Sequence, residues 1–238
     1  MNSKPIPQRI SAFLLCVALL VGLLPTSALA ADTPHDISQG TLTISQNGSY
    51  TITGTTSSNR IIVNSGVTAT ITLAGVSITA PVGEPAIDVQ GTANLTIILQ
   101  DSSENTLVGG TGDASHGAPG IHVPSSATLT IQGGGTLNVT GGSSNANIGG
   151  VGIGGNSTSV GVSSSGEACG TVIILGGTVI ITGGSTQAGT FNGVGIGGGS
   201  QSGGTGGAGG TVIILGGDVT VKGGSGAADI GGGSGTSR

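Results

Sequence analysis

The sequence predicts an all-β protein, a three-sided β-solenoid of parallel strands with about six turns and glycine-rich insertions at its corners. Two observations carry this prediction. The octapeptide GTVIILGG occurs at 170–177 and again at 210–217, 40 residues later, and fixed periods are typical of repeat architectures. Glycine supplies 51 of the 238 residues and Thr, Val, Ile and Ser are abundant, a composition that opposes helices and suits strands.

Each repeat is predicted to hold three short strands, after a partial first repeat at 41–54. The first strand contains a recurrent isoleucine, the second is strongly apolar and the third is shorter. The first strands lie at 61–63, 86–89, 120–123, 150–155, 193–198 and 228–233, the second at 68–73, 94–99, 128–132, 171–175 and 211–215, and the third at 76–79, 106–108, 136–140, 178–182 and 218–221.

The spacing of these strands reduces to a basic unit of 26 residues, 8 from Ile61 to Ala69 and 18 from Ala69 to Ile87. Longer repeats insert residues at one of two corners, which tolerate insertion because loop-closure cost grows slowly with length. Glycines are expected at corners that need a positive φ. In this register two isoleucine columns stack to form the core: Ile61, Ile87, Ile121, Ile153, Ile196 and Ile230, and Ile71, Ile97, Ile131, Ile174 and Ile214.

Residues 1–30 have the features of a secretory signal peptide. Lys4 and Arg9 form a positive region before an apolar run at 10–24, and Ala28-Leu29-Ala30 fits a cleavage site. The run is short for a bilayer span, although an uncleaved anchor is the alternative. We therefore expect a secreted or cell-surface protein. Its expected segments are a lead-in at 31–40, the β-helix over 41–233 and a tail at 234–238, with a further C-terminal part left open.

Cleavage would remove two basic residues and take the formal net charge from −5 to −7. This charge argues against nucleic acid and anionic membranes as partners, because both need clustered Lys and Arg. Cys169 would be the remaining cysteine, so no internal disulfide is expected. A cysteine nucleophile needs a nearby histidine, and none follows His122. Cys169 is therefore interpreted as an incidental loop thiol.

Three resemblances support the same fold. The stretch TITLAGVSITAPVGEPAIDVQGTANLTIILQDSSENTLVGG at 70–110 is similar to the β-helical carbohydrate-binding domain family, including its acidic-polysaccharide binders. The segments GTVIILGG, TVIITGG and GVGIGGG resemble repeats in secreted surface proteins of Gram-positive bacteria. Three sides and short rungs resemble the right-handed parallel β-helix of the pectate-lyase-like type. The resemblance covers about residues 40–233 and implies polysaccharide binding, without assigning a ligand-binding residue.

Catalysis is not expected. Lyases of this fold use Arg or Lys as the base, and Arg60 is the one basic residue between 31 and 221. Hydrolases need two facing carboxylates, and no strand supplies an aspartate pair. The glycine-rich stretches lack the following helix of a phosphate loop. We expect a non-catalytic protein that binds an extracellular polysaccharide or another cell-surface component.

Three alternatives stay open: a purely structural or adhesin solenoid, a polysaccharide lyase or hydrolase, and an ice-binding solenoid with stacked threonines. Aromatic platforms for sugar are nearly absent, since Tyr50 and Phe191 are the aromatics after residue 30. Sugar contacts through hydroxyls, carboxylates or a cation are favoured instead.

The candidate ligand site is one acidic corner of the early repeats, formed by Glu84, Asp88, Asp113, His116 and His122. Asp88 and His122 occupy equivalent positions on consecutive turns, so their Cα atoms are expected about 4.8 Å apart. Neighbouring carboxylates repel, and a cation would relieve that repulsion. Calcium is therefore the one cofactor considered, with Glu84, Asp88 and Asp113 as ligands and an acidic sugar completing its shell. The alternative is a solvated corner.

Overall fold

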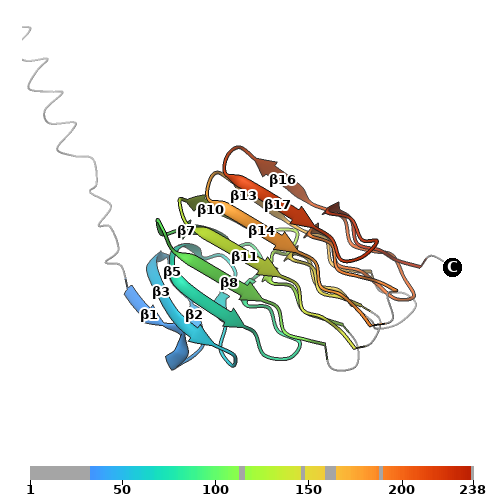
Figure 1. Ribbon diagram of the computed structural model, residues 1–238, viewed down its shortest axis with the longest axis horizontal. Coiled ribbons are helices and arrows are strands. Elements are labelled where there is room, and N and C mark those ends of the chain that lie inside the picture. Colours follow the sequence, from blue (N-terminus) through green and yellow to red (C-terminus); the bar gives the residue numbers. More distant parts are fainter. Residues whose placement is uncertain (1–32, 113–115, 146–147, 159–164, 188–189, 237–238) are drawn as a thin grey trace, which may run out of the picture. The chain divides into compact units, whose positions relative to one another are not determined.

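The computed structural model describes residues 33–112, 116–145, 148–158, 165–187 and 190–236, and the predicted signal peptide lies outside them. Almost all regular structure is β-strand (Figure 1). In this part of the chain no helix is long and apolar enough to cross a membrane. The elements are β1 Thr33–Asp36, the 3-10 helix η1 Ile37–Gln39, β2 Leu42–Ile44, β3 Gly48–Thr56, β4 Ile61–Val63, β5 Thr68–Thr79, β6 Ile87–Val89, β7 Asn94–Leu99, β8 Glu104–Val108, β9 Ile121–His122, β10 Thr128–Gly133, β11 Thr136–Thr140, β12 Ile153–Gly154, β13 Thr171–Ile174, β14 Thr178–Thr182, β15 Ile196–Gly197, β16 Thr211–Ile214, β17 Asp218–Lys222 and β18 Ile230–Gly231.

The strands form two parallel sheets, so the predicted three-sided, right-handed β-helix is wrong. A seven-stranded sheet has the order β18-β15-β12-β9-β6-β4-β2. An eleven-stranded sheet follows the path β16-β13-β10-β7-β5-β8-β11-β14-β17, with β3 paired to β1 and β5 off this path. The larger sheet is bent about β5, and both ends of its path belong to the last repeat. The four repeats from β6 to β17 each contribute one strand to the smaller sheet and two to the larger one, whereas the repeat that begins with β4 contributes the single long strand β5 to the larger sheet.

The missing third sheet is explained at the link between the predicted second and third strands. The sequence predicted a corner after Leu73, but β5 runs unbroken to Thr79. Gly75 takes a positive φ of 80° and lets the strand bend without ending. The buried Asn105 amide accepts hydrogen bonds from the backbone N–H groups of Gly75 and Val76, at 3.0 and 2.9 Å. Both predicted faces therefore share β5 and join into one sheet.

The two predicted isoleucine columns are confirmed by the strand register. Ile87 pairs with Ile61 and Ile121 in the smaller sheet, and Ile131 pairs with Ile97 and Ile174 in the larger one. All six side chains are fully buried. Stacked on copies of themselves, such side chains each stabilise the fold by about 1.5–3 kcal/mol. At the last repeat the columns are open, because Ile214 and Ile230 are 43% and 45% exposed.

Many glycines serve a purpose other than the positive φ expected at corners. Where the insertions leave and rejoin the repeats, the backbones form one line of hydrogen bonds. Gly142 N donates to Ala118 O, Gly150 N to Gly142 O and Gly184 N to Gly150 O, at 2.8–2.9 Å. A Cβ on Gly150 would overlap the Ala118 carbonyl. Glycine is therefore required there by close backbone approach, and the described parts of the insertions stack on one another through backbone hydrogen bonds.

Candidate functional site

The candidate site lies on the smaller sheet, along the column of stacked positions that contains Asp88 and His122. Asp88 in β6 pairs in register with His122 in β9, as predicted. The next positions in that column are Gly154 and Gly197. The column thus changes from long polar side chains to glycine, which leaves room beside His122. A pocket of about 600 Å³ lies at this place.

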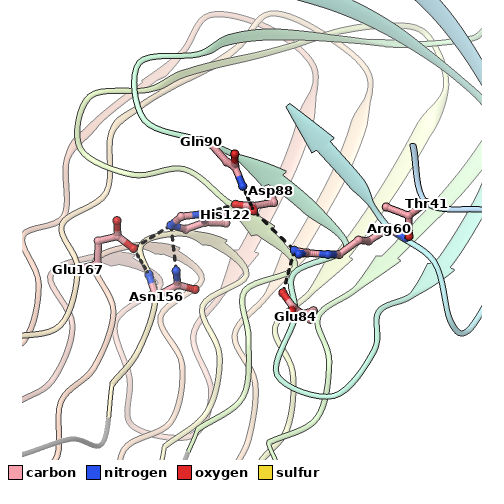
Figure 2. A network of polar contacts seen from close by, with 8 residues as sticks. All are labelled: Thr41, Arg60, Glu84, Asp88, Gln90, His122, Asn156 and Glu167. Carbon is pink, nitrogen blue, oxygen red and sulfur yellow. Dashed lines mark hydrogen bonds and ion pairs between the residues drawn. The ribbon is translucent and has the colours of Figure 1, made fainter. Parts of the chain in front are cut away.

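Five charged side chains around this pocket alternate in sign (Figure 2). Arg60 Nη1 lies 2.8 Å from Glu84 Oε2 and 3.6 Å from Asp88 Oδ2. Asp88 Oδ1 accepts a 2.7 Å hydrogen bond from His122 Nδ1, and Glu167 Oε2 lies 2.8 Å from His122 Nε2. The order is therefore acid, base, acid, base, acid. Gln90 Nε2 donates to Asp88 Oδ2 at 2.9 Å, which satisfies the second carboxylate oxygen.

Burial divides this network into an inner and an outer part. The side chains of Asp88 and His122 are 12% and 10% exposed, whereas those of Glu84 and Glu167 are 44% and 37% exposed. Arg60 is also mostly covered, at 18%. The cationic groups are thus held below the surface, and the charged groups most open to solvent in the pocket are carboxylates.

The imidazole of His122 is held in its charged form. Burial opposes that charge, but the hydrogen bonds to Asp88 and Glu167 outweigh it and raise the pKa of His122 to about 9. Burial also opposes ionisation of Asp88 and Glu167, yet His122 and neighbouring donors hold the pKa of both carboxyls below the usual range. At neutral pH Asp88, His122 and Glu167 are therefore all charged.

Asn156 completes the far side of the network. Its backbone N–H donates to Glu167 Oε2 at 3.1 Å, and its side-chain amide lies 3.1 Å from His122 Nε2. The one proton on Nε2 is donated to Glu167 Oε2, and hydrogen bonds from Asn156 to Glu167 help to lower the pKa of that carboxyl. Asn156 and Glu167 together orient the ring from the side opposite Asp88.

Four of the five predicted ligand residues line this single pocket: Glu84, Asp88, His116 and His122. Asp113 lies outside the described residues. The prediction missed Glu167 and Asn156, and it treated Arg60 only as an isolated base. Both missed residues lie in the insertion that follows β12. Ile153 of β12 stacks on Ile121 of β9, so the residues directly after β12 lie beside His122. This register was the sequence signal that could have placed the start of the insertion at the site.

The structure gives a different electrostatic picture from the one expected for calcium. Arg60 lies between the carboxylates of Glu84 and Asp88, and His122 lies between those of Asp88 and Glu167, so a cation already separates these neighbouring carboxylates. Within the described ranges no group of three or more His, Cys, Asp or Glu side chains is arranged to hold a metal ion. Calcium binding stays a prediction.

Cys169 is buried and packs with the apolar core. Burial raises the pKa of its thiol to about 12, so the thiolate needed for nucleophilic chemistry is scarce at neutral pH.

The fold and the site define the chain as an all-β protein with a pocket lined by polar and charged side chains. The chain belongs to a family of carbohydrate-binding domain-containing proteins, whose model matches residues 38–230. No curated protein and no solved structure matches it. The family match confirms the predicted resemblance to carbohydrate-binding domains, while the resemblance to Gram-positive surface repeats stays a prediction.

Proposed function

We propose that this chain is a secreted, non-catalytic polysaccharide-binding protein and that the pocket beside His122 holds the sugar. The single observation that carries the proposal is a preorganised polar network lining a pocket of about 600 Å³ in a member of a carbohydrate-binding family. Sugar sites combine a preformed hollow with a few well-placed polar groups. Here the network holds its own members in place before any ligand arrives, which lowers the entropy cost of binding.

The accessible groups of the pocket favour a hydroxyl-rich glycan. Glu84 and Glu167 offer carboxylate oxygens, which accept hydrogen bonds from sugar hydroxyls. The cationic groups of Arg60 and His122 are engaged below them. An acidic sugar would face the carboxylates directly, so its binding requires a cation between the two. Calcium-assisted binding of an acidic polysaccharide is therefore the second form of this proposal.

Three observations on the ionisable groups in and near the pocket support a non-catalytic role. A glycosidase needs one carboxylic acid that keeps its proton near neutral pH, whereas the pKa values of Asp88 and Glu167 are lowered. A lyase needs a free base, whereas Arg60 is paired with Glu84 and Asp88. The Cys169 thiol is held protonated by burial.

Calorimetric titration with a neutral oligosaccharide set and with polygalacturonate, each with and without calcium, tests the proposal. Glu84→Gln combined with Glu167→Gln should weaken binding of a neutral glycan at least about ten-fold, because charge-assisted hydrogen bonds are replaced by weaker ones. Asp101→Asn, in the turn between β7 and β8, should bind as the parent does. Polygalacturonate should bind only when calcium is present.

Absence of heat with every glycan would overturn the proposal, as would equal affinities for the parent and the double variant. Release of new reducing or unsaturated ends from any glycan would show that the chain is catalytic.

A further inference from the structure

The pocket beside His122 presents two carboxylates, each with one oxygen engaged and one oxygen open. Oε2 of Glu84 pairs with Arg60, and Oε2 of Glu167 accepts hydrogen bonds from His122 and from the backbone of Asn156. Among the described residues, neither Oε1 atom accepts a hydrogen bond (Figure 2). Both side chains are partly exposed and line the same pocket. Each carboxylate is thus fixed through one oxygen and offers the other to a ligand.

The charges of the network favour a cationic ligand over an anionic one. The network contains three acidic side chains and two basic ones, and both basic groups are mostly buried and already paired with carboxylates. Burial opposes ionisation of Glu167, but the hydrogen bond from His122 outweighs it and holds the pKa of that carboxyl below its usual range. The whole chain also carries more acidic than basic residues, with a formal net charge of −5, which attracts cations from a distance.

A sugar ammonium group matches these open oxygens better than a hydroxyl does. An ammonium has three N–H donors and a positive charge, and charge-assisted hydrogen bonds to carboxylates are about twice as strong as neutral ones. An acidic sugar needs a cation between itself and the carboxylates, whereas an amino sugar carries that charge itself. Calcium needs a shell of six or more oxygens, and within the described ranges no three His, Cys, Asp or Glu side chains are grouped to hold a metal. An ammonium requires no such shell.

We propose that the pocket binds a glycan built of amino sugars, with one ammonium group at Glu84 and a second at Glu167. This inference rests on the proposed function, because it names the class of polysaccharide that the pocket binds. Arg60, Asp88 and His122 connect the two carboxylates and hold them in place. Two fixed contact points suit a polymer with an amine on every unit, because the second contact follows the first at little entropy cost.

Three β-1,4-linked oligosaccharides of equal length test the preference for an ammonium group, because they differ at a single substituent of each ring. Oligomers of glucosamine, N-acetylglucosamine and glucose carry an ammonium, a neutral amide and a hydroxyl at that position. Calorimetric titration is run at about pH 6, where an amine with a pKa of about 7.7–8.0 is protonated. The glucosamine oligomer should bind at least about ten-fold more tightly than the other two. Added salt should weaken its binding more than theirs.

Single charge removals locate the contact. Glu84→Gln and Glu167→Gln each remove one charge with little change of shape, and each should reduce the advantage of the glucosamine oligomer over the glucose oligomer about three-fold or more. The double variant should abolish this advantage. Asp101→Asn, in the turn between β7 and β8, should keep it in full. Circular dichroism confirms that each variant is folded.

A glucose oligomer or N-acetylglucosamine oligomer that binds as tightly as the glucosamine oligomer would overturn this inference and leave polysaccharide binding intact. Absence of heat with the glucosamine oligomer would also overturn it, whereas the proposed function fails only when the wider glycan set gives no heat either. An advantage that persists in the double variant would place the ammonium groups elsewhere. A lysine oligomer that binds as tightly as the glucosamine oligomer would show a general cation site in place of an amino-sugar site.

Discussion

Replacing His122 with glutamine should remove most of the pH dependence of stability between about pH 6.5 and 9. In the folded protein the pKa of His122 is raised to about 9, against 6.5 for an ordinary histidine. A raised pKa means that the folded state holds the proton more tightly than the unfolded chain does. The stabilisation is therefore fully present below pH 6.5 and is lost as the pH rises through 9.

The size of this effect follows from the shift. Each pKa unit corresponds to 1.36 kcal/mol, so the charged form of His122 is favoured in the folded protein by about 3 kcal/mol. The low exposure of the side chain, 10%, keeps solvent from screening most of this interaction. The free energy of unfolding of the parent should fall by roughly that amount between pH 6.5 and 9.

Urea unfolding followed by far-ultraviolet circular dichroism at a series of pH values measures this fall. The series ends near pH 9, because above it the unfolded Cys169 thiol ionises while the buried thiol, with a pKa of about 12, stays protonated. His122→Gln should give a nearly flat profile, and His35→Gln, at β1 and away from the pocket, should keep the slope of the parent. A flat profile in the parent, or the same slope in His122→Gln, would refute this electrostatic account.

Three further predictions concern the core and the glycines. Ile131→Ala should lower the free energy of unfolding by about 2–5 kcal/mol, because it leaves a cavity in a fully buried column; a loss below about 1 kcal/mol in urea unfolding would place Ile131 outside the core. Gly150→Ala should lower the melting temperature by several degrees, since the new methyl group overlaps the Ala118 carbonyl, whereas Gly66→Ala, with nothing near its added carbon, tests positive-φ strain alone. An unchanged melting temperature for Gly150→Ala would contradict the close backbone stacking. Cys169 should resist a water-soluble thiol reagent in the folded protein and react after unfolding, and rapid labelling of the folded chain would show that the thiol is accessible.

The repeat pattern was enough to predict the parallel strands and both isoleucine columns, because strand register depends on residues spaced at fixed intervals. It was not enough to predict how many sheets the strands form. The link Ala74-Gly75 looks like a corner in the sequence, as Gln100–Ser103 does one repeat later. The two links differ in hydrogen bonding. The side-chain oxygen of Asn105 accepts hydrogen bonds from the backbone N–H groups of Gly75 and Val76, so β5 bends at Gly75 and stays within one sheet.

In the site as well, residues on regular strands could be placed from the sequence, whereas residues in insertions and corners could not. Asp88 and His122 could be placed side by side because both lie on strands of known register. Glu167 could not, since it lies in an insertion whose return path the period does not fix. Arg60 stood out in the sequence as an isolated basic residue, but its salt bridge to Glu84 could not be predicted. That contact depends on the conformation of the corner that carries Glu84.

The central claim is that a polysaccharide binds in the pocket beside His122. The chain offers an internal test, because it has three histidines and two of them, His116 and His122, line the pocket while His35 lies on β1. Nuclear magnetic resonance of the three imidazole rings, during titration with the tightest-binding glycan, reports contact at each position in one sample. The rings of His116 and His122 should shift with a common affinity while that of His35 stays unchanged. Saturable binding that leaves His116 and His122 unshifted would contradict the claim.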